Sequence, residues 1–506
     1  MRNTSTELFQ LIKSLDRNEK GYFKKYALLN GSQGNSNNYI RLFDAIDAMK
    51  EYNEAELKKK FKGEKFIVQL HVTKNYLYNT ILKSLRSYSS KSNDHQKILA
   101  GIQDAEILTR KGHYEKALQL IRSTRTYAFE REFWSYATEL IEMERLIHNI
   151  HTKTDSVKSI GEINSERAQI IDILKHEQGY IDLSYKSKTR TFQHGHYQQQ
   201  KEQKKFADIL KEKLFDPKDE PRTVYAKNLA STLKLVYYSL TDNEKKYYDE
   251  ASSGYRVFSQ HAFAVHKNPY GLYNKAFNLG VTFMKLRKYN KMNALLQEMS
   301  ELHKTHKLQL NPRLRGMILE KTMQVSIVYY INSHQFEKGM KQISSTIKAL
   351  ELDKKFISTH SVNNVFYFSA AFYIMAGYLK QAVKSLNQVL VFNPTDLHPD
   401  IKIFSKYLLL IAHYELQHEE MLHTVNALFE PGESVTSLDF LRTRLLSIQN
   451  RKDEISAFSE FKKTLLASND RNMIDKYFDF EAWAESKIQN KPFSLILQSR
   501  QKQEND

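Results

Sequence analysis

The 18 histidines are the residues whose chemistry and spacing first suggest a metal site, because imidazole nitrogen is a common ligand of zinc. The segment HEEMLH places His418 and His423 about 140° apart around a helix, whereas two ligands on one helix face need a spacing of three or four residues. It therefore does not match a metalloprotease signature. Two other pairs have a suitable spacing but no identifiable third ligand: His148 with His151, and His303 with His306.

The sequence contains none of the local motifs that mark common catalytic sites. It has no GxxxxGK[ST] phosphate loop, no GxGxxG dinucleotide turn and no GxSxG nucleophile elbow. It also has no cysteine, which excludes thiolate metal sites, disulfides and cysteine nucleophiles. The HxH pair of His194 and His196 is better interpreted as part of a polar loop than as a metal site. We expect a binding protein without a cofactor; an enzyme whose catalytic residues are scattered without a local motif is the alternative.

Positive charge is concentrated near the N-terminus of a chain that carries a net charge of +18. Between residues 57 and 91, Glu64 is the only acid. The spacing predicts a helix ending near Phe61, a glycine-bearing turn and a longer helix, which loosely resembles a helix-turn-helix DNA-binding unit. The alternative is a solvated face of an N-terminal cap. The residues that we expect to form this basic patch are Lys58, Lys59, Lys60, Lys62, Lys65 and Lys74.

The elements that must carry these residues are helical. Only 16 glycines and 8 prolines occur, which is too few for the turns of all-β or Rossmann-type proteins. With 41% hydrophobic and 26% charged residues, the chain has enough apolar surface to fold around a core. Apolar residues recur at helical spacing, as at Leu70, Leu77, Ile81, Leu85 and Tyr88.

No segment is expected to cross a membrane. The most apolar stretch, from Val365 to Gly377, is shorter than the ~20 residues that a helix needs to span a bilayer. The N-terminal residues lack the apolar core and the small-residue cleavage site of a secretory signal, and the absence of cysteine is compatible with a reducing compartment. We therefore expect a cytoplasmic protein.

One segment, from Phe366 to Pro394, carries the pattern of a known repeat family. Ala370 and Ala382 are small residues that stand where two helices would touch, and a large side chain at either position would force the helices apart. The segment resembles a tetratricopeptide repeat in nearly every pattern position. The remaining pattern positions are Tyr373, Gly377, Tyr378, Leu386, Leu390 and Pro394.

Weaker copies of this pattern occur elsewhere in the chain. Stretches around Ala105, Gly280 and Ile327 resemble the repeat, and a degenerate copy surrounds Ile411. The steps from Gly280 to Ile327, to Ala370 and to Ile411 exceed the ~34 residues of the standard repeat, so helices or loops must be lengthened. The resemblance implies an all-α superhelical solenoid of tetratricopeptide-like helix pairs with an N-terminal helical region. An irregular helical bundle is the alternative.

Polar breaks at residues 87–94 and 430–437 suggest where the chain divides. We expect an N-terminal basic helical region over residues 1–95, the tetratricopeptide-like solenoid over 96–445, and a C-terminal helical cap with a polar tail over 446–506.

The resemblance implies a scaffold or adaptor that binds a protein or peptide on the concave face of the solenoid, and the positive net charge favours an acidic partner. The alternative is a nucleic-acid-binding regulator that combines the basic helix-turn-helix-like region with a repeat sensor domain. The residues that the resemblance directs into the groove are Asn274, Phe277, Lys321, Gln324, Asn364 and Tyr367.

Overall fold

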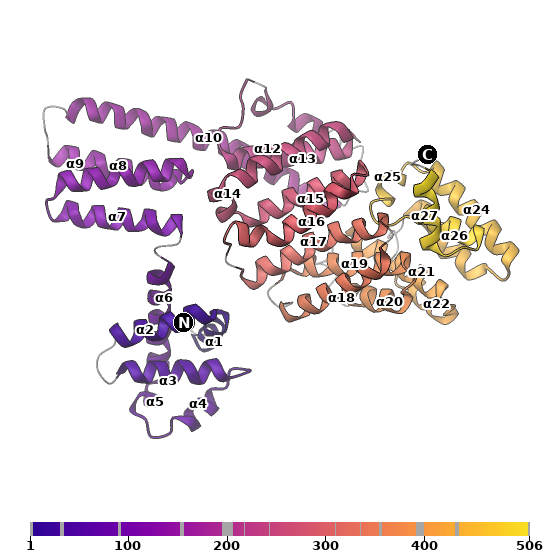
Figure 1. Cartoon of the computed structure of the whole chain (residues 1–506), viewed down its shortest axis with the longest axis horizontal. Coiled ribbons are helices and arrows are strands. Elements are labelled where there is room, and N and C mark those ends of the chain that lie inside the picture. Colours follow the sequence, from indigo (N-terminus) through magenta and orange to yellow (C-terminus); the bar gives the residue numbers. More distant parts are fainter. Residues whose placement is uncertain are drawn as a thin grey trace. The chain divides into compact units, whose positions relative to one another are not determined.

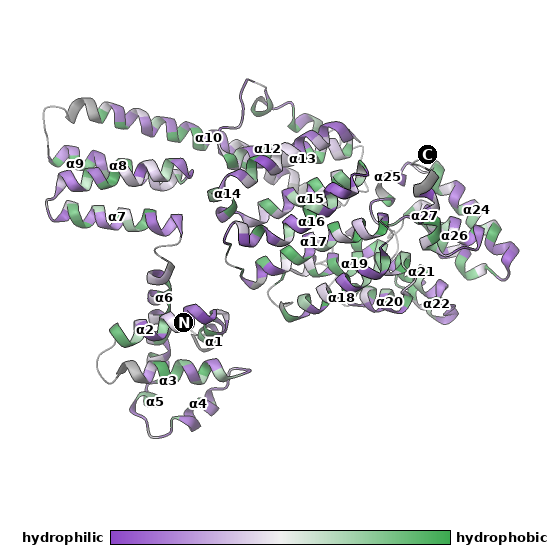
Figure 2. Cartoon of the chain, viewed as in Figure 1, coloured by the Kyte–Doolittle hydropathy of each residue, from purple (hydrophilic) through white to green (hydrophobic). Residues whose placement is uncertain are grey.

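All regular secondary structure that the computed structural model describes is helical (Figure 1). The all-α prediction is therefore confirmed. Hydrophobic and hydrophilic residues are mixed along most helices, as expected for helices that bury one face (Figure 2). In the described part of the chain, every helix is too short or too polar to cross a membrane. The described residues are 4–30, 35–89, 93–151, 156–194, 206–216, 218–241, 243–308, 310–333, 335–353, 357–390, 399–430 and 435–503.

The chain forms two compact units, unit 1 (Met1–Asp172) and unit 2 (Ile173–Asp506). The division falls inside the long helix α10 (Ser156–His194). The boundaries near residues 95 and 445 that the polar breaks suggested stay a prediction. Each unit is described separately below.

Unit 1 begins with helices that enclose their own apolar core. Helices α1, α2 and α3 pack against α6 and against one another. The core residues Leu70, Leu77 and Ile81 come from the predicted apolar stripe of α6, whereas Tyr88 at the end of that stripe is exposed. The helices are α1 (Thr4–Ser14), α2 (Arg17–Asn30), α3 (Asn35–Ala48), α4 (Glu54–Lys60), α5 (Lys65–Val68) and α6 (Leu70–Ser89).

The rest of unit 1 is a series of helices in which each packs on the next. Helix α7 (Asp94–Arg110) packs on α8 (Tyr114–Glu130), and α8 packs on α9 (Trp134–Ile150). Ala105 and Ala117, which belong to the predicted repeat copy around Ala105, are fully buried.

Unit 2 contains helix pairs that follow one another along the chain. Helices α13, α15, α17, α19 and α21 pack side by side in chain order, and α16, α18, α20 and α22 each pack on the helix before them. The helices are α12 (Val224–Leu240), α13 (Glu244–Gln260), α14 (Ala262–Lys267), α15 (Pro269–Lys285), α16 (Tyr289–Thr305), α17 (Pro312–Asn332), α18 (Phe336–Asp353), α19 (Thr359–Met375), α20 (Leu379–Leu390), α21 (Pro399–Glu415) and α22 (Glu419–Asn426).

Small residues allow close contact where these helices cross. Ala370 on α19 and Ala382 on α20 are both fully buried. A Cβ atom at Gly280 on α15 would lie 3.0 Å from the Val325 side chain on α17. The small residues of the predicted repeat pattern therefore lie at helix crossings, whereas Pro394 lies outside the described residues.

Five described turns between helices share one backbone geometry. In each of the five, the middle residue has a positive φ, and the N–H of the next residue donates to a carbonyl five residues earlier, as from Tyr378 to Tyr373 at 2.7 Å. This is the Schellman arrangement that ends many helices, and it favours glycine because other residues are strained at positive φ. The middle residues are Gly112, Glu132, Arg287, Gly377 and Gln417.

We expect Gly377→Ala to lower the free energy of unfolding of unit 2 by about 1 kcal/mol. A Cβ at Gly377 would meet no atom within 4 Å, so the cost comes from the backbone alone. Gly161 in α10 is the matched control, because it is equally unobstructed and has no positive φ. Gly161→Ala should stabilise unit 1 by about 0.5–1 kcal/mol. Urea unfolding monitored by circular dichroism measures both; equal and stabilising effects would contradict the turn geometry.

The C-terminal helices share a core with the last helix pairs of unit 2. The Tyr477 ring stacks on Phe404 of α21 with 4.2 Å between centroids, and the Trp483 indole N–H donates to Glu415 of α21 at 2.6 Å. One apolar cluster extends from Met323 to Ile496. These helices are α23 (Thr436–Arg444), α24 (Arg451–Ala467), α25 (Arg471–Ile474), α26 (Phe480–Gln489) and α27 (Phe493–Gln503).

Candidate functional site

Three of the six predicted groove residues are accessible, and they lie together on helices α15 and α17. Asn274 is exposed, and Phe277 and Lys321 are half-buried. The Lys321 ammonium lies 4.9 Å from the centre of the Phe277 ring. A second cation lies over a ring of the same helix, since the Arg313 guanidinium is 5.6 Å from the centre of Tyr270. These five residues are called the α15–α17 face.

Glu320 lies beneath this face and anchors Lys321. Its carboxylate is buried and lies 3.2 Å from the Lys321 Nζ atom, and it accepts a hydrogen bond from Asn364 at 3.3 Å. Burial works to raise the pKa of Glu320, but the charge of Lys321 and the hydrogen bonds outweigh it and hold the pKa below its ordinary value. Lys321 is therefore oriented by a buried acid, and its side chain stays partly exposed.

The other predicted groove residues are buried, which corrects their proposed role. Tyr367 has no exposed surface, and its hydroxyl donates to the Tyr477 carbonyl at 3.1 Å. Asn364 is buried against Glu320. Gln324 is also buried, and within the described residues its Oε1 atom has no hydrogen-bond partner. The C-terminal segment covers Tyr367, so this tyrosine is not available to a partner.

The predicted basic patch lies in unit 1, where α4 ends and α5 begins. Lys58, Lys59 and Lys60 form the end of α4, Lys62 lies in the turn, and Lys65 opens α5. All five are exposed. Lys58 pairs with Glu54 at 3.0 Å.

Lys74, the sixth predicted member of the patch, is instead buried. Its ammonium lies 2.6 Å from Glu54 and donates to the Tyr52 hydroxyl at 3.2 Å. Burial works to lower the pKa of Lys74, but these two hydrogen bonds outweigh it and raise the pKa above its ordinary value. The burial of Lys74 could have been predicted from the sequence, because Lys74 falls between Leu70 and Leu77 on the apolar stripe of α6.

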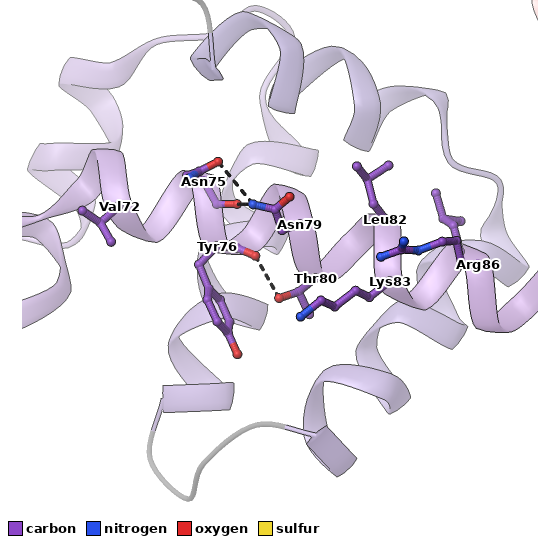
Figure 3. A pocket seen from close by; sticks show the side chains of 9 residues that line it. Val72, Asn75, Tyr76, Asn79, Thr80, Leu82, Lys83 and Arg86 are labelled. Atoms are coloured by element: carbon purple, nitrogen blue, oxygen red, sulfur yellow. Dashed lines mark hydrogen bonds between the residues drawn. The ribbon is translucent and has the colours of Figure 1, made fainter. Parts of the chain in front are cut away.

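The outward side of α6 carries a row of polar and apolar side chains that lines a shallow hollow (Figure 3). Val72 and Tyr76 are about half exposed, and Tyr76 stacks on Tyr39 with 4.4 Å between ring centres. The Asn79 amide donates to the Asn75 carbonyl at 3.0 Å. The row, called the α6 face, consists of Val72, Asn75, Tyr76, Asn79, Lys83 and Arg86. None of these residues belongs to the predicted basic patch, because the prediction followed the density of lysines along the chain.

We expect Glu54→Gln to destabilise unit 1 by about 1–2 kcal/mol at neutral pH, because buried Lys74 loses the carboxylate that balances its charge. The effect stays this small because Glu54 is partly exposed to solvent. Hydrogen bonds from Lys74 and Lys58 lower the pKa of Glu54 from 4.5 to about 2. A depressed folded-state pKa means that the contribution is complete above pH 4.5 and is lost as the pH falls toward 2.

Urea unfolding at several pH values measures this contribution. The variant should show a flatter decline of stability between pH 4.5 and 2 than the unchanged protein. Glu56→Gln is the control, because Glu56 is exposed on the same helix. Identical pH profiles for the Glu54 variant and the unchanged protein would contradict the pairing.

The histidines do not assemble with other ligands in the described part of the chain, where no group of three or more histidine, aspartate or glutamate residues could hold a metal ion. His148 lies 3.8 Å from Glu144, and His418 lies 3.3 Å from His413. His196, from the HxH pair, lies outside the described residues.

Comparison with known proteins does not identify a family for this chain. The sequence matches no protein-family model, and no curated protein matches it. The functional argument therefore depends on the surfaces described above.

Proposed function

We propose that this protein is a scaffold that binds an acidic protein or peptide segment on the α15–α17 face. The observation that carries the proposal is the side-by-side packing of α13, α15, α17, α19 and α21, each with a second helix behind. Stacked helix pairs of the tetratricopeptide type form a superhelical solenoid, and such solenoids bind partners along the surface of their first helices. The shared Schellman turns and the small residues at the crossings support that architecture.

The chemistry of the face favours an acidic partner. Tyr270, Asn274 and Phe277 follow one another at helical spacing along one side of α15. Arg313 and Lys321, on the neighbouring helix, each place a cation over one of the two rings. A carboxylate can approach either cation, while the rings offer apolar contact and Asn274 can bond a peptide backbone.

A fluorescence anisotropy titration tests the proposal with two labelled peptides of equal length, one acidic and containing aromatic residues, the other basic. We expect the acidic peptide to bind and the basic one not to bind. The double variant Arg313→Gln with Lys321→Gln should weaken acidic-peptide binding by about tenfold or more, which corresponds to about 1.4 kcal/mol.

The matched control is Lys338→Gln with Lys341→Gln, which removes the same charge from exposed positions of α18. This control should bind the acidic peptide as the unchanged protein does. Equal weakening in both double variants would show attraction by net charge alone and would contradict a specific face.

A further inference from the structure

The α6 face and the exposed lysines of α4, the following turn and α5 all lie within unit 1, so they are separate from the α15–α17 face. Helix α4 ends in a lysine run, a short turn follows at Phe61–Glu64, and α5 leads into the long helix α6. Leu57 and Phe61 share a core with Leu70 and Leu77, so the helices around the turn are held together by packing. The ion pair between buried Lys74 and partly exposed Glu54 adds a second contact between α4 and α6.

We propose that α6 enters the major groove of double-stranded DNA while the exposed lysines of α4, the turn and α5 contact phosphates. A helix of 20 residues is about 30 Å long. The major groove is ~12 Å wide and admits one α-helix. Leu70, Leu77 and Ile81 bury one side of α6. On the opposite side Val72, Asn75 and Asn79 are exposed (Figure 3).

The side chains of the α6 face suit the edges of base pairs. Asn75 and Asn79 lie one turn apart, and asparagine can form two hydrogen bonds with adenine. Val72 is about half exposed and can contact a thymine methyl group. Lys83 and Arg86 continue the same row toward the end of the helix, where cations can reach guanine or a phosphate.

The exposed lysines that precede α6 in the chain favour a polyanion. Lys59, Lys62 and Lys65 are exposed, and within the described residues no acidic side chain pairs with them. Lys58 and Lys74 are different, because both pair with Glu54. These three uncompensated cations can bind phosphates, while the hydrogen-bonding side chains of the α6 face can meet base edges.

A titration of the full-length protein with a fluorescent duplex of mixed sequence tests the charge component. We expect binding at ~50 mM salt, with the logarithm of the binding constant falling linearly as the logarithm of salt concentration rises. Each phosphate contact contributes ~0.9 to that slope, so the triple variant Lys59→Gln, Lys62→Gln and Lys65→Gln should reduce it by about 2.7. The control triple variant, Lys338→Gln, Lys341→Gln and Lys348→Gln, removes equal charge from α18 and should leave the slope unchanged.

A selection from random duplexes tests the base-reading component. The unchanged protein should enrich a short sequence, and the double variant Asn75→Ala with Asn79→Ala should lose that preference while keeping the salt slope. Both asparagines are exposed, so folding should be little affected; circular dichroism checks this. No duplex binding at ~50 mM salt, equal slopes in the two triple variants, or tighter binding of RNA than of duplex DNA would each overturn the proposal.

Discussion

Replacing Trp483 by alanine is expected to lower the free energy of unfolding of unit 2 by about 3–5 kcal/mol. The indole is almost fully buried and packs edge-on against Phe458, with 5.0 Å between ring centres. Its N–H donates to Glu415 of α21, so alanine would leave both a cavity and an acid that has lost one donor. Urea unfolding followed by circular dichroism measures the loss.

Two controls accompany this prediction. The first separates the loss of packing from the loss of the hydrogen bond, and the second shows whether the effect is confined to unit 2. Trp483→Phe keeps an aromatic ring and removes the donor, so its effect should be smaller, about 1–3 kcal/mol. Trp134, the other tryptophan of the chain, lies in α9 of unit 1, and its fluorescence transition should not shift in either variant. A change below about 1 kcal/mol for Trp483→Ala would show that the C-terminal helices are not part of the core.

Ala370→Leu is expected to destabilise unit 2 by about 2–3 kcal/mol, because a fully buried crossing on α19 has no space for three more carbon atoms. Thermal unfolding should show a lower transition temperature for this variant. Neighbouring side chains or the helices themselves would have to move apart.

Ala467→Leu is the matched control for this substitution. Ala467 is exposed at the end of α24, so the same added atoms should change stability by less than about 0.5 kcal/mol. If Ala370→Leu were as mild as Ala467→Leu, the small residues of the repeat pattern would not be steric requirements.

The helical class and many local features could be predicted from the sequence because they depend on local spacing. Scarce glycine and proline, together with apolar residues at helical intervals, predicted an all-α chain, and the structure confirms it. Gly377, a position of the repeat pattern, lies in the turn between α19 and α20. Ala370 and Ala382 were predicted at a crossing, and both are buried.

The exposure of the predicted groove residues could not be predicted as reliably, because it depends on which distant segment of the chain packs over each helix. The resemblance to the repeat family implied that Tyr367 faces a partner, yet the segment around Tyr477 lies against it. The contact joins residues more than a hundred positions apart, and no local pattern reports such a contact. Lys74 is a different case. It lies on the apolar stripe of α6, and its charged side chain can be buried there because Glu54 pairs with it.

Amide hydrogen exchange of the full-length protein, with and without the acidic peptide, tests the central claim most directly. Binding on the α15–α17 face should slow exchange in α15 (Pro269–Lys285) and α17 (Pro312–Asn332) and leave α18 (Phe336–Asp353) and α20 (Leu379–Leu390) unchanged. Slower exchange in α18 and α20, or no change in α15 and α17 under saturating peptide, would contradict the account.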